Sequence, residues 1–225
     1  MIESQFSQTD ELTGLFSRQA FLEALTETLA SAKAETAELP LSLALIDIDH
    51  FLRINEEYGH TAGDNALVEL AKTIQASSGE NAVTARYGGD EFAVLWPGLV
   101  RERALFILEQ IRLKMEACQY VTGKGETVTG ISISGGVASF PLDGRSEVEL
   151  LRKADQALYH AKAAGRGQIR LAFEEKMVPK TTHFTQTQLE RLSKLADERG
   201  ASEADLLREA LDGLLTKYGV NPIES

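Results

Sequence analysis

Four carboxylates lie in two short segments of the chain. Asp47 and Asp49 end a nearly continuous apolar run, residues 41–46, and Asp90 and Glu91 directly follow a Gly-Gly pair. If these segments are neighbouring strands, the carboxylates converge as the hard oxygen ligands that Mg²⁺ takes, completed by substrate phosphates. The ordinary alternatives are a helix-capping aspartate and a solvated acidic hairpin tip. Capping suits Asp49 better than Asp47, because a carboxylate at the end of a buried strand is costly without a partner.

Two basic side chains could serve the same chemistry. Lys162 and Arg166 are four residues apart at the end of a predicted helix that Gly165 terminates, so both can reach one side of it. They could simply complement the helix dipole. The functional alternative is a clamp on a triphosphate.

The elements that must position these groups are read from apolar spacing and Gly or Pro breaks. The Gly-Gly pair, Gly88 and Gly89, predicts a hairpin turn that uses φ > 0, and Gly135–Gly136 predicts a bulge or a close backbone approach. The order is mixed, so we expect an α+β sheet layered with helices. Helices are expected near residues 21–29, 51–58, 64–76, 105–115 and 148–164, and strands at 41–47, 82–85, 92–96, 128–138 and 168–173.

Composition narrows the function classes. The 225 residues are 43% hydrophobic and 25% charged, as in globular proteins, and the single cysteine excludes an internal disulfide. No apolar run approaches membrane-spanning length and the N-terminus lacks a signal peptide's basic start, so we expect a cytoplasmic protein without membrane contact. A net charge of -11 leaves no broad footprint for nucleic acid. Phosphorylated small molecules remain compatible if a divalent cation screens the carboxylates.

The dense set of motifs resembles the GGDEF family of diguanylate cyclases, which condense two GTP into cyclic di-GMP and two pyrophosphates. The resemblance covers about residues 10–172 and implies a palm-like nucleotidyl cyclase domain with an antiparallel-rich sheet. The segments that carry it are Asp10-Glu11-Leu12-Thr13-Gly14-Leu15, residues 45–51, Ile54-Asn55, Gly59-His60, Gly63-Asp64, residues 86–92, residues 134–138, residues 154–162, and Gly165-Arg166.

This resemblance implies a role for each matching position. Asp47, the Ile48 carbonyl and Asp90 would bind Mg²⁺ or Mn²⁺. Asp90 and Glu91 would be the catalytic carboxylates, with Asp90 favoured as the base that activates the 3′-hydroxyl. Because each domain binds one GTP, the reaction implies a homodimer. The implied substrate-binding residues are Phe51, Asn55, His60, Asp64, Leu67, Arg86, Gly88, Gly89, Lys162 and Arg166.

The sequence departs from the family pattern at several positions. Leu52 stands where the family has a phosphate-binding lysine, so one phosphate contact is missing, which affects the rate more than the reaction type. Ser17-Arg18-Gln19 replaces Asn-Arg-Arg, and Gly167 replaces an asparagine. The product-binding Arg-x-x-Asp motif would fall at residues 79–82, which read Gly-Glu-Asn-Ala. We therefore expect no product inhibition through that segment.

A second module is expected at residues 176–225, after a cyclase domain at 1–175. Thr185 with Gln188 predicts a capping box, and apolar stripes predict two helices. This segment resembles ribbon-helix-helix proteins, in which a short strand pairs with the same strand of a second copy and enters the DNA major groove. The corresponding strand here would be residues 180–184. Seven basic and eight acidic side chains in the segment favour dimerisation over DNA binding. The alternative functions are a GTP-sensing module and a cyclic di-GMP-linked DNA-binding regulator.

Overall fold

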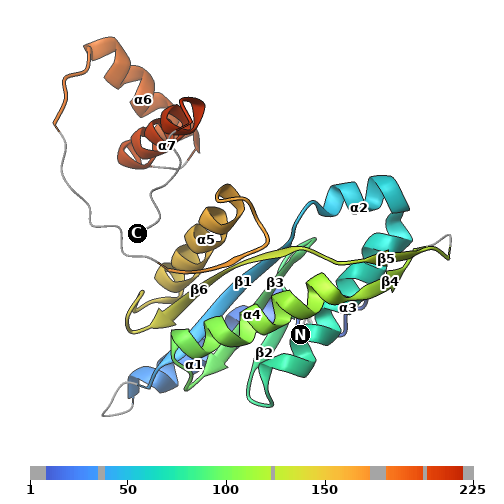
Figure 1. Cartoon of the computed structure of the whole chain (residues 1–225). Helices are drawn as coiled ribbons and strands as arrows, with labels where there is room; N and C mark the ends of the chain where they lie inside the picture. The colour runs from blue at the N-terminus through green and yellow to red at the C-terminus, as the bar shows by residue number, and fades with distance from the viewer. Residues whose placement is uncertain (1–8, 35–38, 123–124, 173–180, 200–201, 220–225) are drawn as a thin grey trace, which may run out of the picture. The chain divides into compact units, whose positions relative to one another are not determined.

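The chain divides into two compact units, residues 1–174 and 175–225. The computed structural model describes residues 9–34, 39–122, 125–172, 181–199 and 202–219 (Figure 1). Among these residues, no helix combines the length and the apolar character needed to span a bilayer.

The first unit is built on a five-stranded sheet with the order β2-β3-β1-β6-β7. All neighbouring strands run antiparallel except β6 and β7, which are parallel. The mixed sheet flanked by helices confirms the predicted α+β fold. The strands are β1 (Leu41–Ile48), β2 (Val83–Arg86), β3 (Glu91–Pro97), β6 (Ile133–Phe140) and β7 (Ile169–Leu171).

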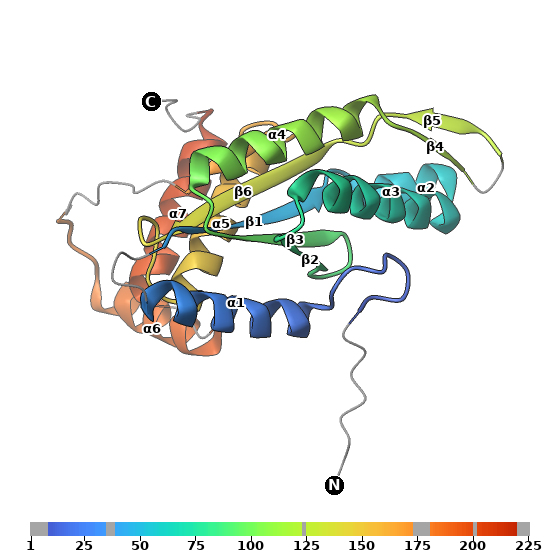
Figure 2. The same cartoon turned by 90° about the horizontal axis from the view of Figure 1, so that it is seen from below.

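Helices cover both faces of this sheet, which explains why every residue of β1 is buried. Figure 2 shows α3 (His60–Ser78) and α4 (Arg101–Ala117) on one face, and α1 (Arg18–Ala34) on the other. Ala44 and Ile46 belong to the hydrophobic cluster with α3 and α4, whereas Leu43 and Leu45 join α1 and α5 (Glu147–Ala163). Alternation along a strand thus supplies two cores, because successive side chains point to opposite faces.

The predicted close backbone approach at Gly135–Gly136 is confirmed. A Cβ on Gly136 would overlap the main chain of α5 at Ala154 and Leu158. Only glycine lets α5 pack this closely onto β6. This contact fixes the height of α5, and with it Lys162, above the sheet.

One predicted strand was wrong in its extent. Residues 128–138 form two strands, β5 (Thr127–Thr129) and β6, because Gly130 takes φ 83° and breaks the alternation between them. β5 pairs with β4 (Gln119–Val121), a strand that the sequence pattern did not predict. The helix at residues 51–58 was right, and α2 spans Phe51–Tyr58. Residue 173 of the predicted last strand lies outside the described residues.

The second unit contains two helices, α6 (Gln186–Arg199) and α7 (Glu203–Lys217). The predicted capping box is present: Gln188 N–H donates to Thr185 Oγ1 at 3.3 Å, and Thr185 N–H donates to Gln188 Oε1 at 2.9 Å. Residues 181–184 pair with no strand among the described residues, and Lys180 lies outside them.

Candidate functional site

The ends of β1 and β3 bring the predicted metal-binding segments together. Asp47 stands opposite Glu91 in the β1–β3 register, and Ile48 N–H donates to the Asp90 carbonyl at 3.4 Å. The hairpin closes with Tyr87 N–H donating to the Glu91 carbonyl at 2.7 Å. Antiparallel pairing therefore places the strand-end aspartate beside the Asp90–Glu91 turn, as the sequence pattern required.

Asp47 is the electrostatic centre of this cluster. It is 7% exposed, and its Oδ2 lies 2.8 Å from Nζ of Lys162. Burial raises its pKa, Lys162 opposes this, and the charges of Asp90 and Glu91 raise it further, leaving the pKa above its ordinary value. Asp47 therefore has one neutralising partner, Lys162, and two carboxylates close enough to act against its charge. The capping interpretation of Asp47 is wrong, because its partner is Lys162 and α2 has no side-chain cap.

The residues around Asp47 could supply some, but not all, of the ligands of a divalent cation. Among the described residues, no three His, Cys, Asp or Glu side chains are grouped to hold a metal ion by themselves. Asp47, Asp90 and the Ile48 carbonyl offer oxygens from adjoining strand ends. Mg²⁺ is commonly held by one or two carboxylates together with substrate phosphates and water. These oxygens fit such a shared site, and the excess of negative charge around Asp47 favours the binding of a cation.

Asp49 has a different environment from the one predicted. It does not cap α2, whose N-cap is His50 in the left-handed region at φ 57°. Its carboxylate, in a residue 5% exposed, accepts hydrogen bonds from Ser132 Oγ at 2.6 Å and Ser134 Oγ at 2.7 Å. It also accepts from Gly167 N–H at 3.0 Å. Asp49 therefore joins three segments of the chain.

In the Gly-Gly turn only Gly88 has a structural reason to lack a side chain, and it is not the predicted one. Neither Gly88 nor Gly89 has a positive φ, so the expectation of a left-handed turn was wrong. A Cβ on Gly88 would lie 2.9 Å from Oε2 of Glu91, whereas one on Gly89 would meet nothing within 4 Å. The absence of a side chain at Gly88 therefore makes room for the Glu91 carboxylate.

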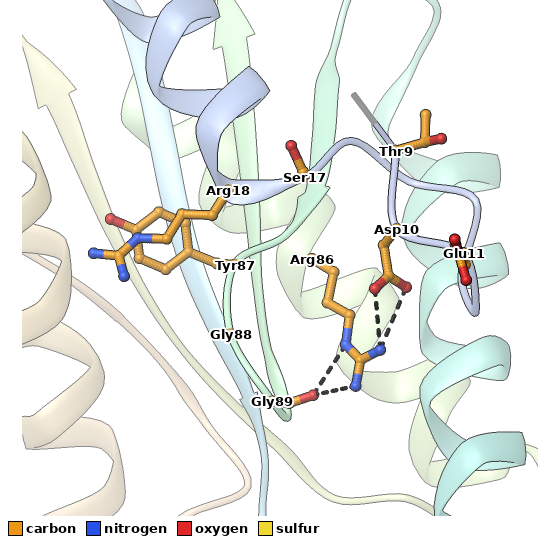
Figure 3. A pocket seen from close by; sticks show the side chains of 9 residues that line it. All are labelled: Thr9, Asp10, Glu11, Ser17, Arg18, Arg86, Tyr87, Gly88 and Gly89. Carbon is orange, nitrogen blue, oxygen red and sulfur yellow. Dashed lines mark hydrogen bonds and ion pairs between the residues drawn. The ribbon is translucent and has the colours of Figure 1, made fainter. Parts of the chain in front are cut away.

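Arg86 holds the turn from the side of the N-terminal loop. Its guanidinium donates to the Gly89 carbonyl at 2.7 and 3.0 Å and to the Asp10 carboxylate at 3.2 and 3.3 Å (Figure 3). Asp10 also accepts from N–H and Oγ1 of Thr13. Burial acts to raise the pKa of Asp10, but the Thr13 hydrogen bonds and the Arg86 charge outweigh it and lower the pKa. Arg86, one of the predicted substrate-binding residues, therefore already uses its guanidinium in bonds within the protein.

A cleft of about 510 Å³ opens beside this contact (Figure 3). The Arg18 guanidinium lies over the Tyr87 ring at 4.7 Å, and Phe21 meets Tyr87 edge-on at 5.9 Å. Of the predicted site residues, only Arg86, Gly88 and Gly89 line the cleft, together with Thr9, Asp10, Glu11, Ser17, Arg18 and Tyr87. Sequence reasoning assigned Asp10 no role. Its signal was the spacing to Thr13, since an aspartate often accepts from the residues just after it in a turn.

The predicted nucleoside-binding residues gather at the α2–α3 corner. Oδ1 of Asn55 is buried and has no hydrogen-bond partner in the part of the chain that the structure describes, which is unusual for an interior polar atom. Gly63 allows this packing, because a Cβ there would overlap Asn55 and come within 3.1 Å of Phe51 Cζ. His60 and Asp64 are exposed at the start of α3. Leu67 is 2% exposed and packs in the core, so its side chain forms the interior side of this corner.

The positions considered for phosphate binding differ in their surroundings. Lys162 reaches Asp47, so it does more than complement the dipole of α5. Arg166 is exposed and takes φ 64°, a left-handed conformation that is uncommon for a residue with a side chain. Leu52, at the start of α2, is 76% exposed and contributes no charge.

A sheet-end carboxylate cluster with a lysine from a flanking helix defines a candidate nucleotide site on an α+β scaffold. The sequence matches the family described as "Diguanylate cyclase, GGDEF domain" over residues 7–168. Because this match covers most of the chain, the chain belongs to the GGDEF family.

Individual relatives agree with this assignment. The chain is 38% identical over 170 residues to the diguanylate cyclase DgcP of Pseudomonas aeruginosa, covering 76% of this chain and 25% of DgcP. It is 34% identical over 165 residues to the response regulator PleD of Caulobacter vibrioides, covering 73% of this chain and 36% of PleD. The chain therefore spans well under half the length of these relatives.

A solved structure shows the same domain fold. The GGDEF domain of DgcB from Caulobacter crescentus, determined in complex with c-di-GMP, superposes with a TM-score of 0.69 at 31% identity. The match covers 77% of this chain and 98% of that domain. The shared fold therefore accounts for nearly the whole of the DgcB domain.

Proposed function

We propose that this protein is a diguanylate cyclase, which condenses two GTP into cyclic di-GMP and two pyrophosphates. The observation that carries the proposal is the cluster of Asp47, Asp90, Glu91 and Lys162 at one end of the sheet of a GGDEF domain. The cluster combines carboxylate oxygens that can bind a metal ion with a lysine that can bind phosphates. This is the pairing that nucleotidyl transfer needs.

Asp47, Asp90 and the Ile48 carbonyl would hold the divalent cation, which when bound neutralises charge on the α-phosphate and the leaving pyrophosphate. Lys162 and Arg166 bind the β- and γ-phosphates as the second source of positive charge. Asp90 accepts the proton of the attacking 3′-hydroxyl, and Glu91 lies next to it in the turn. Gly88 leaves the space in which the Glu91 carboxylate sits.

The guanine end of the substrate lies at the α2–α3 corner in this proposal. The unpartnered Oδ1 of Asn55 is an acceptor that the base edge would satisfy. Asp64 adds a carboxylate acceptor for the N–H groups of guanine. Adenine presents a different donor pattern on that edge, so the two acceptors favour GTP over ATP.

The reaction needs two copies of the chain, because each domain supplies one GTP. We assign the pairing to residues 176–225 as a ribbon-helix-helix-like dimerisation module. Its support is the exposed apolar stripe of α7, where Leu211 is 54% and Leu214 is 51% exposed. DNA binding by residues 180–184 is the weaker assignment, since the module is nearly neutral.

Product inhibition through the segment before the hairpin is not expected. Residues 79–82 carry no arginine and no aspartate, so they offer neither the guanidinium nor the carboxylate of the family's product-binding motif. Turnover that falls when cyclic di-GMP binds at this segment would contradict the assignment.

The decisive experiment is to incubate the purified protein with GTP and Mg²⁺ and to separate the nucleotides by chromatography. We expect cyclic di-GMP and pyrophosphate from the wild type. Asp90→Asn should lower the rate by about 100-fold or more while the protein stays folded. GTP that binds without any product would refute the cyclase and favour a GTP-sensing module, a role that the loss of a basic residue at Leu52 would suit.

A further inference from the structure

Asp49 is a buried carboxylate that the proposed metal site does not use. It is 5% exposed, yet no lysine or arginine is paired with it among the described ion pairs. Three donors satisfy it instead: Ser132 Oγ at 2.6 Å, Ser134 Oγ at 2.7 Å and Gly167 N–H at 3.0 Å. A buried carboxylate is tolerated only with such bonds, so this arrangement places a strict requirement on where Gly167 lies.

The backbone that Asp49 holds is the turn that follows α5. Gly165, Arg166 and Gly167 take φ values of 113°, 64° and 60° in succession. A left-handed conformation costs a residue with a side chain roughly 1–2 kcal/mol. The Arg166 N–H donates to the Ala161 carbonyl at 3.0 Å, which closes the turn onto its own helix. The bond from Gly167 to Asp49 Oδ2 ties the same turn to the end of β1.

Asp47, inside β1, and Asp49, one residue past its end, therefore contact neighbouring points at the end of α5. Ser134, the cross-strand partner of Asp47, donates its hydroxyl to Asp49 Oδ1, so both carboxylates lie at the same end of the sheet. Asp47 Oδ2 contacts Lys162 Nζ at 2.8 Å, and Asp49 Oδ2 accepts from Gly167 N–H at 3.0 Å. Arg166 lies between these two attachment points along the chain.

We propose that Asp49 is a positioning residue for the triphosphate: by fixing the turn of residues 165–167 against the end of β1, it places Arg166 next to Lys162 for the β- and γ-phosphates. This role rests on the proposed function, because it assigns Arg166 to the substrate's pyrophosphate end. Asp49 touches neither the metal nor the substrate. It acts through the backbone of Gly167.

A purely structural role makes a different prediction. If Asp49 only joined β1 to Ser132 and Ser134, its loss would lower the stability of the fold and weaken every ligand alike. A positioning role instead weakens only ligands that carry the β- and γ-phosphates. The two are separated with 3′-deoxy-GTP and 3′-deoxy-GMP, which lack the attacking hydroxyl and cannot be turned over.

We therefore expect Asp49→Ala, in the full-length protein with Mg²⁺, to raise the Kd for 3′-deoxy-GTP by about tenfold, or about 1.4 kcal/mol. The Kd for 3′-deoxy-GMP should change by less than about twofold. Arg166→Ala should show the same selective loss, and the double variant should lose no more than Arg166→Ala alone. Asp49→Asn keeps an acceptor for Gly167 N–H and should stay near the wild type. Asp49→Ser, too short to reach Gly167, replaces the alanine variant if that does not fold.

Asp143 offers a matched control. Its side chain is 6% exposed and accepts from Ser139 N–H at 2.8 Å and Arg101 at 2.9 Å, but it lies past the opposite end of β6. Asp143→Ala should lower thermal stability without changing the preference for the triphosphate. Hydrogen exchange should become faster at residues 164–168 in the Asp49 variant and not in the Asp143 variant.

The outcomes separate this inference from the proposed function. Asp49→Ala and Arg166→Ala losses that multiply in the double variant, or equal weakening of both nucleotides, would overturn the positioning role. A wild type that binds 3′-deoxy-GTP as predicted but makes no cyclic di-GMP from GTP would refute only the cyclase. A wild type with no preference for the triphosphate over the monophosphate would refute the clamp and the role of Asp49 together.

Discussion

At the scale of single residues, Lys162 can pair either with Asp47 or with the phosphates of the proposed substrate. In the structure it lies 2.8 Å from Asp47, a proposed metal ligand, and the proposed substrate offers it phosphates instead. Lys162→Met should therefore tighten the binding of Mn²⁺ alone, because Asp47 loses its neutralising partner. The same variant should weaken 3′-deoxy-GTP by about tenfold, since a charge-assisted contact to phosphate is lost.

Electron paramagnetic resonance of free Mn²⁺ and calorimetry with the nucleotide measure these two effects separately. Lys153→Met on the same helix is the control, and it should alter neither binding constant. Weaker Mn²⁺ binding by Lys162→Met would contradict the prediction, because it would mean that the ammonium supports the metal site rather than competing with the ion.

The Asp10 carboxylate should make the stability of the fold depend on pH in the acid range. The pKa of Asp10 lies below its ordinary value of 3.8, so its carboxylate stabilises the fold above that pH and loses this contribution as the pH falls through the folded-state pKa. Asp10→Asn should lower the free energy of unfolding at pH 7 by about 1 kcal/mol, since it weakens the contacts to Arg86 and Thr13.

Chemical denaturation of both proteins at several pH values checks this. The difference between wild type and Asp10→Asn should be constant near neutrality and shrink below about pH 3.8. A difference that stays the same at low pH would show that lost packing, and not the carboxylate charge, is responsible.

At the scale of elements, the packing of α5 on β6 depends on Gly136. A methyl group there would overlap the α5 backbone, which cannot move away as the tip of a side chain can. Gly136→Ala should therefore lower the free energy of unfolding by about 3 kcal/mol and reduce activity, because α5 carries Lys162. Gly89→Ala, where a Cβ meets nothing within 4 Å, should change stability by less than about 0.5 kcal/mol. Equal thermal midpoints of the two variants would contradict this.

Local patterns predicted the elements well where one signal dominated. The apolar run that became β1 is buried on both faces, and α2 has the predicted bounds. The sequence failed where two strands share one alternating pattern, since Gly130 gives no local sign that it turns the chain out of the sheet. It also misjudged Gly88, whose purpose is space for Glu91 and not a positive φ. Such contacts depend on side chains that only the folded register brings together.

The residues of the functional site could likewise be predicted only where they follow a local sequence pattern. The carboxylates could be predicted because they follow strand signals, and the structure places Asp47, Asp90 and Glu91 together. The partners of Asp49 could not, because Ser132, Ser134 and Gly167 lie far along the chain and carry no pattern of their own. Small polar residues become informative only when the topology shows what they face.

At the scale of the whole molecule, the second unit is the part whose stability the single chain explains least. Among its described side chains, only Ala196 and Leu206 are buried. Leu207, Leu211, Leu214 and Tyr218 are exposed and recur at helical spacing along α7. Two short helices that leave such a stripe uncovered bury too little surface to be stable alone. A second copy of the same helix pair is the partner that the proposed reaction requires.

This predicts how activity depends on protein concentration. Deleting residues 175–225 should leave a folded domain, as the separately solved GGDEF domain of DgcB indicates for its own chain. Its activity per molecule should rise with concentration, because encounters of two domains then limit the rate, whereas the full chain should stay constant until its dimer dissociates. At low concentration we expect a loss of about tenfold or more on deletion.

The stripe itself can be tested without removing the module. Leu211→Glu with Leu214→Glu should reproduce the deletion, because a charge on each of two apolar positions prevents a dry contact between copies. Glu209→Lys, on another side of α7, should leave the activity constant with dilution. Sedimentation should show monomers for the double variant and dimers for the control. Full activity of the deleted protein at the lowest concentration would mean that the two domains meet without this module, and residues 175–225 would then need another function.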